Sequence, residues 1–240
     1  MALSLKRVRL SSNNSVGNSR SVTSNQTGIH PDLETTVRRH LEEPYRKPIA
    51  EQTQNILDQI EKKHIEIGGD LILDSGCGTG VSSYNLAEQF PNDLIVGVDQ
   101  SDFRLSKNKS ELEKQLTSDN ILLFRANIID IWLLMAKNNW KLGRHYVFYP
   151  NPWPKKKHLQ RRWHGHPIFP TLIKLGGQLE LRSNWKMYVD EFSEAIEIAI
   201  DVKEPVEPFV FVEKAVTPFE KKYQLSGQDL YCYQINLSNG

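Results

Sequence analysis

The chain has 240 residues, of which 39% are hydrophobic and 25% are charged, so it can form the core of one large domain. Its 30 Lys and Arg residues nearly balance its 29 Asp and Glu residues, and the net charge of +1 excludes a uniformly basic nucleic-acid-binding protein. Cys77 and Cys232 lie far apart, which favours neither a disulfide framework nor a zinc site, and no apolar run reaches the roughly 18 residues of a membrane span. We therefore expect a cytoplasmic protein without a metal or a membrane partner.

The N-terminal segment differs in composition from the rest of the chain. It is rich in Ser and Asn, and no acidic residue precedes Asp32. Because such a segment buries little apolar surface, we expect residues 1–30 to form a mobile segment. A flexible basic tail is the favoured interpretation, and an organelle transit peptide is the alternative. The folded domain is then expected over residues 31–240.

Periodic apolar positions predict two N-terminal helices, over residues 32–43 and 48–64, within a helical region 31–66. After them, predicted strands alternate with predicted helices. The strands are expected at residues 71–74, 94–99, 121–125, 145–150 and 177–183, and the helices from about Thr79, Asp102, Asp130, Pro167 and Asn184. This alternation is typical of a Rossmann-like α/β fold with a doubly wound, mostly parallel sheet. Runs at residues 209–212 and 230–237 predict a C-terminal antiparallel edge.

A glycine-rich turn follows the first predicted strand. Gly76, Gly78 and Gly80 have a GxGxG spacing, which permits a tight turn and lets a ligand lie against bare backbone. A dinucleotide site would favour a small residue at position 81, but the chain has Val81. The pattern therefore indicates S-adenosylmethionine rather than NAD. Cys77, inside this turn, is interpreted as a small tucked residue and not as a nucleophile.

Polar residues also end the next two predicted strands. Asp99 ends the second strand, where its carboxylate can accept hydrogen bonds from both hydroxyls of a ribose. Asn127 lies two residues past the third strand and can reach an adenine amino group. A glycine turn, a solvated acid and a polar loop residue are each common in proteins. Their occurrence at three successive strand ends favours a nucleotide-like cofactor.

The stretch NPWPKKKHLQRRWHGHP, residues 151–167, follows the fourth predicted strand. Pro152 and Pro154 restrict the backbone around Trp153, so the loop is expected to be rigid. A concentrated positive charge follows, made of Lys155, Lys156, Lys157, Arg161 and Arg162. Such a run binds phosphates, although a solvated charged surface is the alternative interpretation.

Three stretches together resemble the tRNA (guanine-N7)-methyltransferase family. They are YPNPWPKKKHLQRRW, LGGQLELRSNW and TPFEKKYQLSGQDLYCYQI, within a similarity that covers about residues 71–237. The resemblance implies a class I methyltransferase fold, S-adenosylmethionine as methyl donor and N7 of a tRNA guanine, of the guanine-46 type, as acceptor. It also implies tRNA as the partner of the basic run.

The resemblance implies roles for individual residues. Asn151 takes the position of the catalytic loop residue. The implied cofactor-binding residues are Asp74, Gly76, Cys77, Gly78, Gly80, Asp99, Gln100, Asn127 and Asn151. The implied substrate-binding residues are Lys155, His158, Arg161, Arg162, Asn184, Thr217 and Glu220.

Two positions depart from the family pattern. Asn151 and Asn184 stand where the family has Asp, and each change removes a carboxylate that could accept from a guanine edge. The segment TPFE also fits a helix capping box, which would explain Thr217 and Glu220 without a substrate. Two alternatives therefore stay open: a methyltransferase for a small molecule or nucleotide, and a non-catalytic RNA-binding relative.

Overall fold

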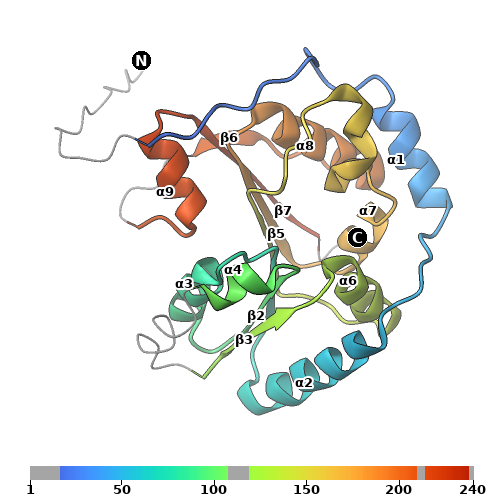
Figure 1. The fold of residues 1–240 in the computed structure, drawn as a ribbon. Coiled ribbons are helices and arrows are strands. Elements are labelled where there is room, and N and C mark those ends of the chain that lie inside the picture. The colour runs from blue at the N-terminus through green and yellow to red at the C-terminus, as the bar shows by residue number, and fades with distance from the viewer. Residues whose placement is uncertain (1–16, 108–118, 210–213, 238–240) are drawn as a thin grey trace, which may run out of the picture.

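A seven-stranded sheet forms the centre of the computed structural model, which describes residues 17–107, 119–209 and 214–237 (Figure 1). The strand order is β3-β2-β1-β4-β5-β7-β6. The first five strands in this order, β3, β2, β1, β4 and β5, are parallel to one another, and β7 runs antiparallel to both of its neighbours. The strands are β1 (Leu71–Ser75), β2 (Leu94–Asp99), β3 (Ile121–Arg125), β4 (Arg144–Phe148), β5 (Gln178–Ser183), β6 (Val206–Phe209) and β7 (Leu230–Asn236). The predicted mostly parallel sheet with an antiparallel C-terminal edge is confirmed.

Helices cover both faces of the sheet. Figure 1 shows α3, α4 and α9 on one side, and α2, α6, α7 and α8 on the other. The α-helices are α1 (Leu33–Glu42), α2 (Glu51–Ile67), α3 (Val81–Gln89), α4 (Asp102–Ser106), α6 (Ile128–Lys137), α7 (Phe169–Lys174), α8 (Lys186–Ile200) and α9 (Pro218–Leu225). Two short 3-10 helices, η1 (Lys156–Arg161) and η2 (Trp163–Gly165), follow the loop after β4.

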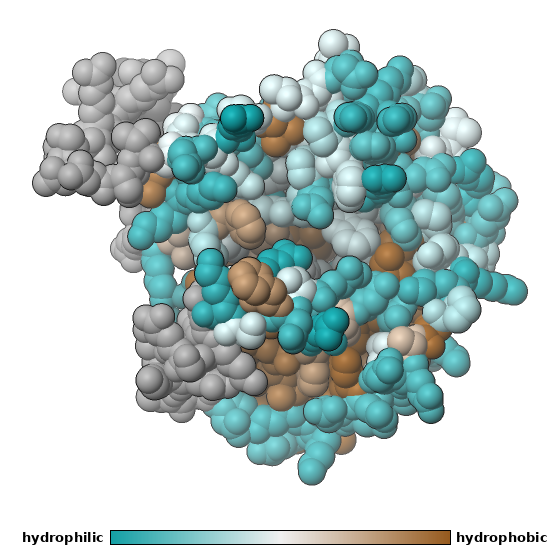
Figure 2. All heavy atoms as spheres, in the orientation of Figure 1, coloured by the Kyte–Doolittle hydropathy of each residue, from teal (hydrophilic) through white to brown (hydrophobic). Residues whose placement is uncertain are grey.

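The alternation of side chains along each strand divides the core between the two faces. Leu71 and Leu73 of β1 pack in the larger cluster under α2, α6 and α8, whereas Ile72 packs in the smaller one beside α3. At the β3 edge, residues 121–124 are only half-buried and Arg125 is exposed. In the space-filling view, hydrophobic residues gather below the centre of the visible face, where β3 runs in Figure 1, and hydrophilic residues cover most of the rim of that face (Figure 2). The central strands β1 and β2 are therefore the most enclosed support for the loops at their ends.

Two element boundaries differ from the predictions. Helix α6 begins at Ile128 instead of near Asp130, because the side chain of Asn127 accepts a hydrogen bond from Ile129 N and so caps the helix. Strand β6 covers Val206–Phe209, whereas the predicted strand covers 209–212. Residues 210–212 lie outside the described residues. The position of β6 at the edge accommodates Pro208, which cannot donate to a sheet ladder.

Residues 17–30 form an extended strap across the surface. Ser19 N donates to Ser226 Oγ at 3.0 Å, Ser24 Oγ donates to Pro154 O, and His30 N donates to Glu191 Oε1 at 2.9 Å. Composition predicts a mobile segment through residue 30, and that mobility stays a prediction. The polar groups of the strap bond to groups far along the chain, which composition cannot reveal. Residues 1–16 lie outside the described residues.

Neither cysteine has the character of a reactive thiol. Cys77 and Cys232 are both free and buried. Burial raises the pKa of the Cys77 thiol well above its usual value and that of Cys232 to about 12. Within residues 17–107, 119–209 and 214–237, no cluster of His, Cys, Asp and Glu is arranged to hold a metal ion. In the same part of the chain, no helix has the length and apolar character to cross a bilayer.

Candidate active site

A cavity of about 260 Å³ opens at the carboxyl ends of the central strands. β1 and β4 are neighbours in the sheet, but the chain passes from β1 to β2 on one side and reaches β4 on the other. This arrangement makes their boundary a topological switch point, where open α/β sheets bind ligands. The lining residues are Ser75, Gly76, Val98, Asp99, Gln100, Arg104, Ile128, Phe148, Tyr149, Pro150, Asn151, Trp153, Arg161, Trp163 and Tyr188.

The glycine turn after β1 leaves open space for a ligand. Gly76, Gly78 and Gly80 have φ angles of 84°, 61° and 81°, which residues with side chains rarely adopt. A Cβ atom added at Gly76 or Gly78 would meet no heavy atom within 4 Å. At Gly80 it would lie 2.8 Å from Leu123 Cδ1, so that position is needed for packing. The first two glycines thus form a bare backbone surface, and the third joins the turn to the sheet.

Asp99 lies at the end of β2, beside this turn. Its carboxylate accepts hydrogen bonds from Gly78 N at 3.0 Å and from Ser101 N at 2.7 Å. Arg104 Nη2 lies 3.1 Å from Asp99 Oδ1, and the arginine side chain is 47% exposed. A carboxylate has about four acceptor positions, so these three donors do not exhaust it, and the exposed arginine can move aside. Asp99 is thereby held at the cavity wall with capacity for further donors.

Asp74 lies one residue before the cavity lining and is fully buried. Its Oδ2 accepts hydrogen bonds from Ser82 Oγ at 2.6 Å and Ser83 Oγ at 2.7 Å. Its Oδ1 is buried without a hydrogen-bond partner among the described residues. Burial raises the pKa of this carboxyl from 3.8 to about 6, and the two serine hydrogen bonds only partly oppose that effect. A buried oxygen with no partner next to an open turn is a site where a ligand donor would fit.

The pH dependence of stability tests this description of Asp74. Because the pKa of Asp74 is higher in the folded state, stability is fully present below about pH 4 and falls as the pH rises through about 6. A shift of about two pKa units corresponds to about 3 kcal/mol in the free energy of unfolding. We expect Asp74→Asn to remove that contribution, so the difference between variant and wild type should change by this amount between pH 4 and pH 7. Urea unfolding at several pH values measures the difference, and parallel curves would contradict the assignment.

The loop after β4, residues 149–155, brings Asn151 to the opposite wall of the cavity. Tyr149 and Trp153 have positive φ angles of 51° and 45°, an uncommon conformation for residues with large side chains. Arg161 lies over the ring of Trp153 at 4.7 Å. Between these two fixed aromatic residues, Asn151 is exposed and lines the cavity. The loop therefore places the polar side chain of Asn151 across from Asp99, on a backbone whose conformation is restricted.

The model of one protein family matches residues 69–233, a range that contains the sheet, the cavity and the loop after β4. That family is described as "Putative methyltransferase". The chain belongs to this methyltransferase family. The recognition of a methyltransferase from its loop and strand motifs is confirmed.

Curated relatives of this methyltransferase carry the name tRNA (guanine-N(7)-)-methyltransferase. The protein from Francisella philomiragia is 29% identical over 131 residues, which cover 53% of this chain and 56% of that protein. The one from Alcanivorax borkumensis is 26% identical over 163 residues, which cover 66% and 67%, respectively. The chain spans about half the length of the first curated relatives that it matches.

Solved structures share the fold of this methyltransferase at low identity. One, described as an antibiotic related methyltransferase, has a TM-score of 0.56 and 11% identity and covers 79% of this chain and 96% of its own. Another is a variant of the 16S rRNA (adenine(1408)-N(1))-methyltransferase from Catenulisporales acidiphilia, solved with the cosubstrate SAM. Its TM-score is 0.51 at 14% identity, and the match covers 74% of this chain and 89% of its own. The predicted class I methyltransferase fold is confirmed.

Arg162 has a different place in this methyltransferase from the predicted one in the phosphate-binding run. Its side chain is fully buried and forms an ion pair with the equally buried Glu191. Its Nε and Nη2 atoms also donate to the carbonyl oxygen of Trp153, at 3.3 and 3.2 Å, and Nη2 donates to Lys155 O at 3.5 Å. The buried Arg162 side chain therefore connects two parts of the chain. It binds carbonyl oxygens of the loop after β4 and the carboxylate of Glu191 on α8, 29 residues away in sequence.

Thr217 and Glu220 form the capping box of α9. Thr217 Oγ1 accepts from Glu220 N, and Glu220 Oε2 accepts from Thr217 N and Val216 N. Glu220 is fully buried, and its Oε1 lies 2.7 Å from Arg182 Nη1. These contacts are all made within the chain, and the substrate contact that the resemblance implies for both residues stays a prediction. The alternative interpretation, a helix cap, describes the observed contacts.

The other predicted residues divide between the cavity and its surroundings. Asn184 Nδ2 donates to Gln228 Oε1 at 2.7 Å, outside the cavity lining. Asn127 caps α6, and its neighbour Ile128 reaches the cavity instead. Gln100 and Arg161 line the cavity, whereas Lys155 lies in a separate groove. His158 packs its ring edgewise against Trp153 at 5.6 Å.

Sequence reasoning missed the buried carboxylate at Glu191. It accepts hydrogen bonds from Gln26, His30, Arg162 and His164. Burial would raise its pKa, but the hydrogen bond and charge of His164 and the charge of Arg162 lower it to about 2. A signal was present, because Glu191 falls on the apolar face of α8 with buried Tyr188 and Ala195 at helical spacing.

Proposed function

We propose that this chain transfers a methyl group from S-adenosylmethionine to N7 of a guanine in tRNA. The observation that carries the proposal is the cavity at the switch point of a methyltransferase fold, with Asp99 on one wall and the Asn151 loop on the other. The curated relatives named tRNA (guanine-N(7)-)-methyltransferase support the choice of acceptor.

The residues present fit S-adenosylmethionine. The open backbone at Gly76 and Gly78 would lie against the cofactor, because no heavy atom lies within 4 Å of a Cβ atom built at either position. Asp99 would accept from the ribose hydroxyls, and the buried oxygen of Asp74 without a partner marks a second acceptor beside the turn. When bound, S-adenosylmethionine supplies an electrophilic methyl group on a sulfonium.

The acceptor chemistry needs alignment more than proton transfer. N7 of guanine carries a lone pair, so no base must remove a proton before the methyl group is transferred. The contribution of the chain is then to orient the base and to exclude water, which Asn151 and Trp153 on a constrained loop are placed to do. Asn151 offers one acceptor and two donors, so it can bind the edge of a base without carrying charge.

Mass spectrometry of tRNA nucleosides tests the proposal. Unmodified tRNA incubated with S-adenosylmethionine and the wild-type chain should gain 7-methylguanosine. Asp99→Ala should weaken S-adenosylmethionine binding by about 1 to 3 kcal/mol, because ribose hydroxyls lose a buried partner. Asp102→Ala, which removes an exposed carboxylate three residues away, is the matched control and should leave binding unchanged.

Each outcome separates a part of the proposal. Undiminished binding to the Asp99→Ala protein by calorimetry would contradict the cofactor assignment, provided that its melting temperature shows a folded chain. Bound S-adenosylmethionine without any 7-methylguanosine in tRNA would contradict the acceptor.

A small molecule or nucleotide is the second candidate acceptor. Among the described residues that line the cavity, Asp99 is the only carboxylate. Glu220 pairs with Arg182 outside the lining, and Asn184, which stands where the family has Asp, also lies outside it. A guanine edge presents N–H donors that carboxylates commonly accept, so this lining favours an acceptor bound by other contacts. Methylation of free nucleotides in place of tRNA would select this candidate.

A further inference from the structure

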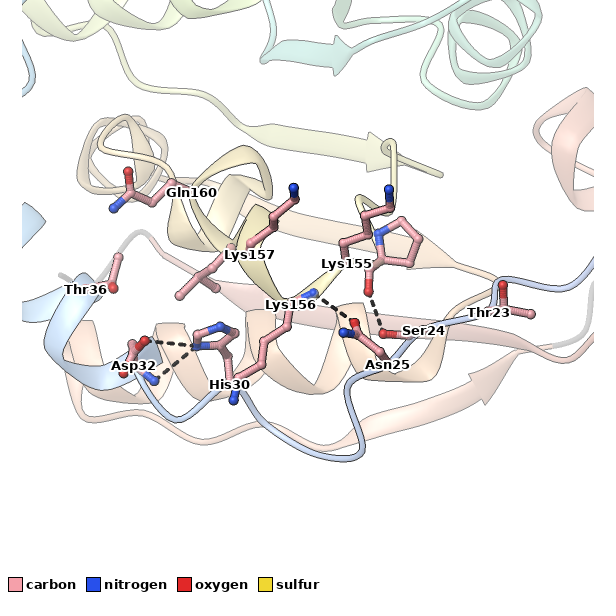
Figure 3. A pocket seen from close by; sticks show the side chains of 12 residues that line it. Thr23, Ser24, Asn25, His30, Asp32, Thr36, Lys155, Lys156, Lys157 and Gln160 are labelled. Carbon is pink, nitrogen blue, oxygen red and sulfur yellow. Dashed lines mark hydrogen bonds and ion pairs between the residues drawn. The ribbon is translucent and has the colours of Figure 1, made fainter.

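A second and larger hollow lies beside the active-site loop, between the strap and η1. Its volume is about 920 Å³. The strap supplies one wall through Thr23, Ser24 and Asn25. The basic turn, residues 155–162, supplies the other through Lys155, Lys156 and Lys157 (Figure 3). We call this hollow the strap groove. Pro154 and Lys155 belong both to it and to the loop after β4, so the groove begins where the active-site loop ends.

The strap groove concentrates positive charge without internal neutralisation. Within residues 17–107, 119–209 and 214–237, no carboxylate lies within 4.0 Å of the ammonium groups of Lys155, Lys156 or Lys157. Asp32 is the one carboxylate in the described lining, and it lies 3.9 Å from His30 Nδ1 at one end. The groove as a whole therefore favours an anion.

The three lysines point to both sides of the groove. In Figure 3, Lys155 and Lys157 extend in the same direction, away from the strap, whereas Lys156 extends across the strap toward His30. An extended chain of anions along the turn could therefore meet positive charge at more than one point. A single compact anion would meet only one side.

Hydrogen bonds hold both walls in place. Ser24 Oγ donates to Pro154 O, and Lys156 N donates to Asn25 Oδ1 at 3.2 Å. Beyond the groove, His30 N donates to the buried Glu191, which also pairs with Arg162 of the basic turn. The strap and the basic turn are thus fastened to the same carboxylate, so the groove exists before a ligand arrives.

We infer that the strap groove binds the phosphodiester backbone of the RNA substrate, next to the nucleotide that enters the active site. This inference rests on the proposed function. Phosphate oxygens accept hydrogen bonds from ammonium groups and from side-chain hydroxyl and amide donors, and Lys156, Thr23 and Gln160 in the groove lining present these groups. The continuity of the groove with the loop after β4 places those phosphates beside the acceptor base.

Charge-matched variants test the groove through the salt dependence of tRNA binding. One variant replaces Lys155, Lys156 and Lys157 by Ala, and the control replaces Lys62, Lys137 and Lys174, which are exposed on α2, α6 and α7. Both lose three positive charges. The groove variant should bind unfractionated tRNA at least about tenfold more weakly, and the slope of log K against log salt should become shallower by about two. The control variant should retain the wild-type slope.

Crosslinking tests whether the strap itself forms a wall of the RNA site. A photoreactive phenylalanine at Thr23, which lines the groove, should crosslink bound tRNA. The same residue at Thr35, exposed on α1 outside the lining, should not. The crosslink at position 23 should disappear when the three groove lysines are replaced.

The results distinguish this inference from the proposed function. Wild-type methylation of tRNA together with equal salt slopes for the two triple variants would overturn the groove and leave the function. Tight, groove-dependent tRNA binding without methylation would overturn the function and leave the groove. A wild-type chain that does not bind tRNA would overturn both.

Discussion

Replacing Glu191 by Ala should lower the free energy of unfolding by about 3 to 5 kcal/mol, the largest effect of any single substitution that we consider. Glu191 and its partner Arg162 are both fully buried. Removal of the carboxylate leaves a buried guanidinium without a counterion, together with three other donors that lose their acceptor. The cost arises from those orphaned groups more than from the ion pair itself.

Urea unfolding of Glu191→Ala measures this effect, and Glu194→Ala is the matched control. Glu194 lies almost one turn further along α8 and is half-buried, and among the described residues its side chain forms no ion pair within 4.0 Å and no hydrogen bond. Its replacement should change the stability by less than about 0.5 kcal/mol. A loss below about 1 kcal/mol for Glu191→Ala would contradict the buried network.

The kinetics of Arg162→Lys test separately whether Arg162 orients the loop after β4 or only stabilises the fold. Lysine keeps the charge near Glu191 but lacks the planar fork that reaches the carbonyl oxygens of Trp153 and Lys155. We expect it to lower kcat more than it raises the KM for S-adenosylmethionine, because the loop loses its orientation while Asp99 is untouched. Equal effects on both constants would indicate a general loss of folded protein.

Replacing Glu220 by Ala should lower the free energy of unfolding by about 3 kcal/mol. The substitution removes the capping box of α9, worth about 1 kcal/mol, and one of the two carboxylates that pair with the mostly buried Arg182. Glu180 remains beside Arg182 and limits the loss. The family resemblance instead implies a contact with guanine, which would lower turnover while leaving stability intact.

The two interpretations of Glu220 are separated by measuring stability and methyl transfer on the same protein. Lys221→Ala, at the next and exposed position of α9, is the control and should behave as wild type. Wild-type stability with a large rise in the KM for tRNA would support the substrate role. A lower unfolding free energy with an unchanged KM would support the structural one.

The architecture could be predicted from sequence patterns that extend over a few residues. The alternation of apolar strands and amphipathic helices from residue 71 onward led to the order of the elements, and β1, β2 and β3 begin where predicted. The glycine turn and Asp99 were predicted because their chemistry depends on positions next to strand ends. The type of each element and the residue at its end depend on neighbouring positions, so local sequence contains the information.

Contacts between distant segments were not predictable in the same way. In the sequence, Arg162 cannot be told apart from the other cationic residues of the basic run. Its buried ion pair with Glu191 forms only in the folded chain. The strap reads as unstructured because its groups bind main-chain and side-chain partners 130 or more residues away. Glu191 is the exception, because its place on the apolar face of α8 marks it as buried and in need of a partner.

The long separations within the strap also imply an order of assembly during synthesis. Residues 17–30 are synthesised before their partners, because Ser24 and His30 bond to Pro154 and Glu191, which follow 130 and 161 residues later. Ser19 bonds to Ser226, 207 residues further along the chain. The strands β1, β2 and β3 can therefore pair while the strap is still without partners, and the strap can support the active-site loop only after Pro154 and Glu191 have been synthesised.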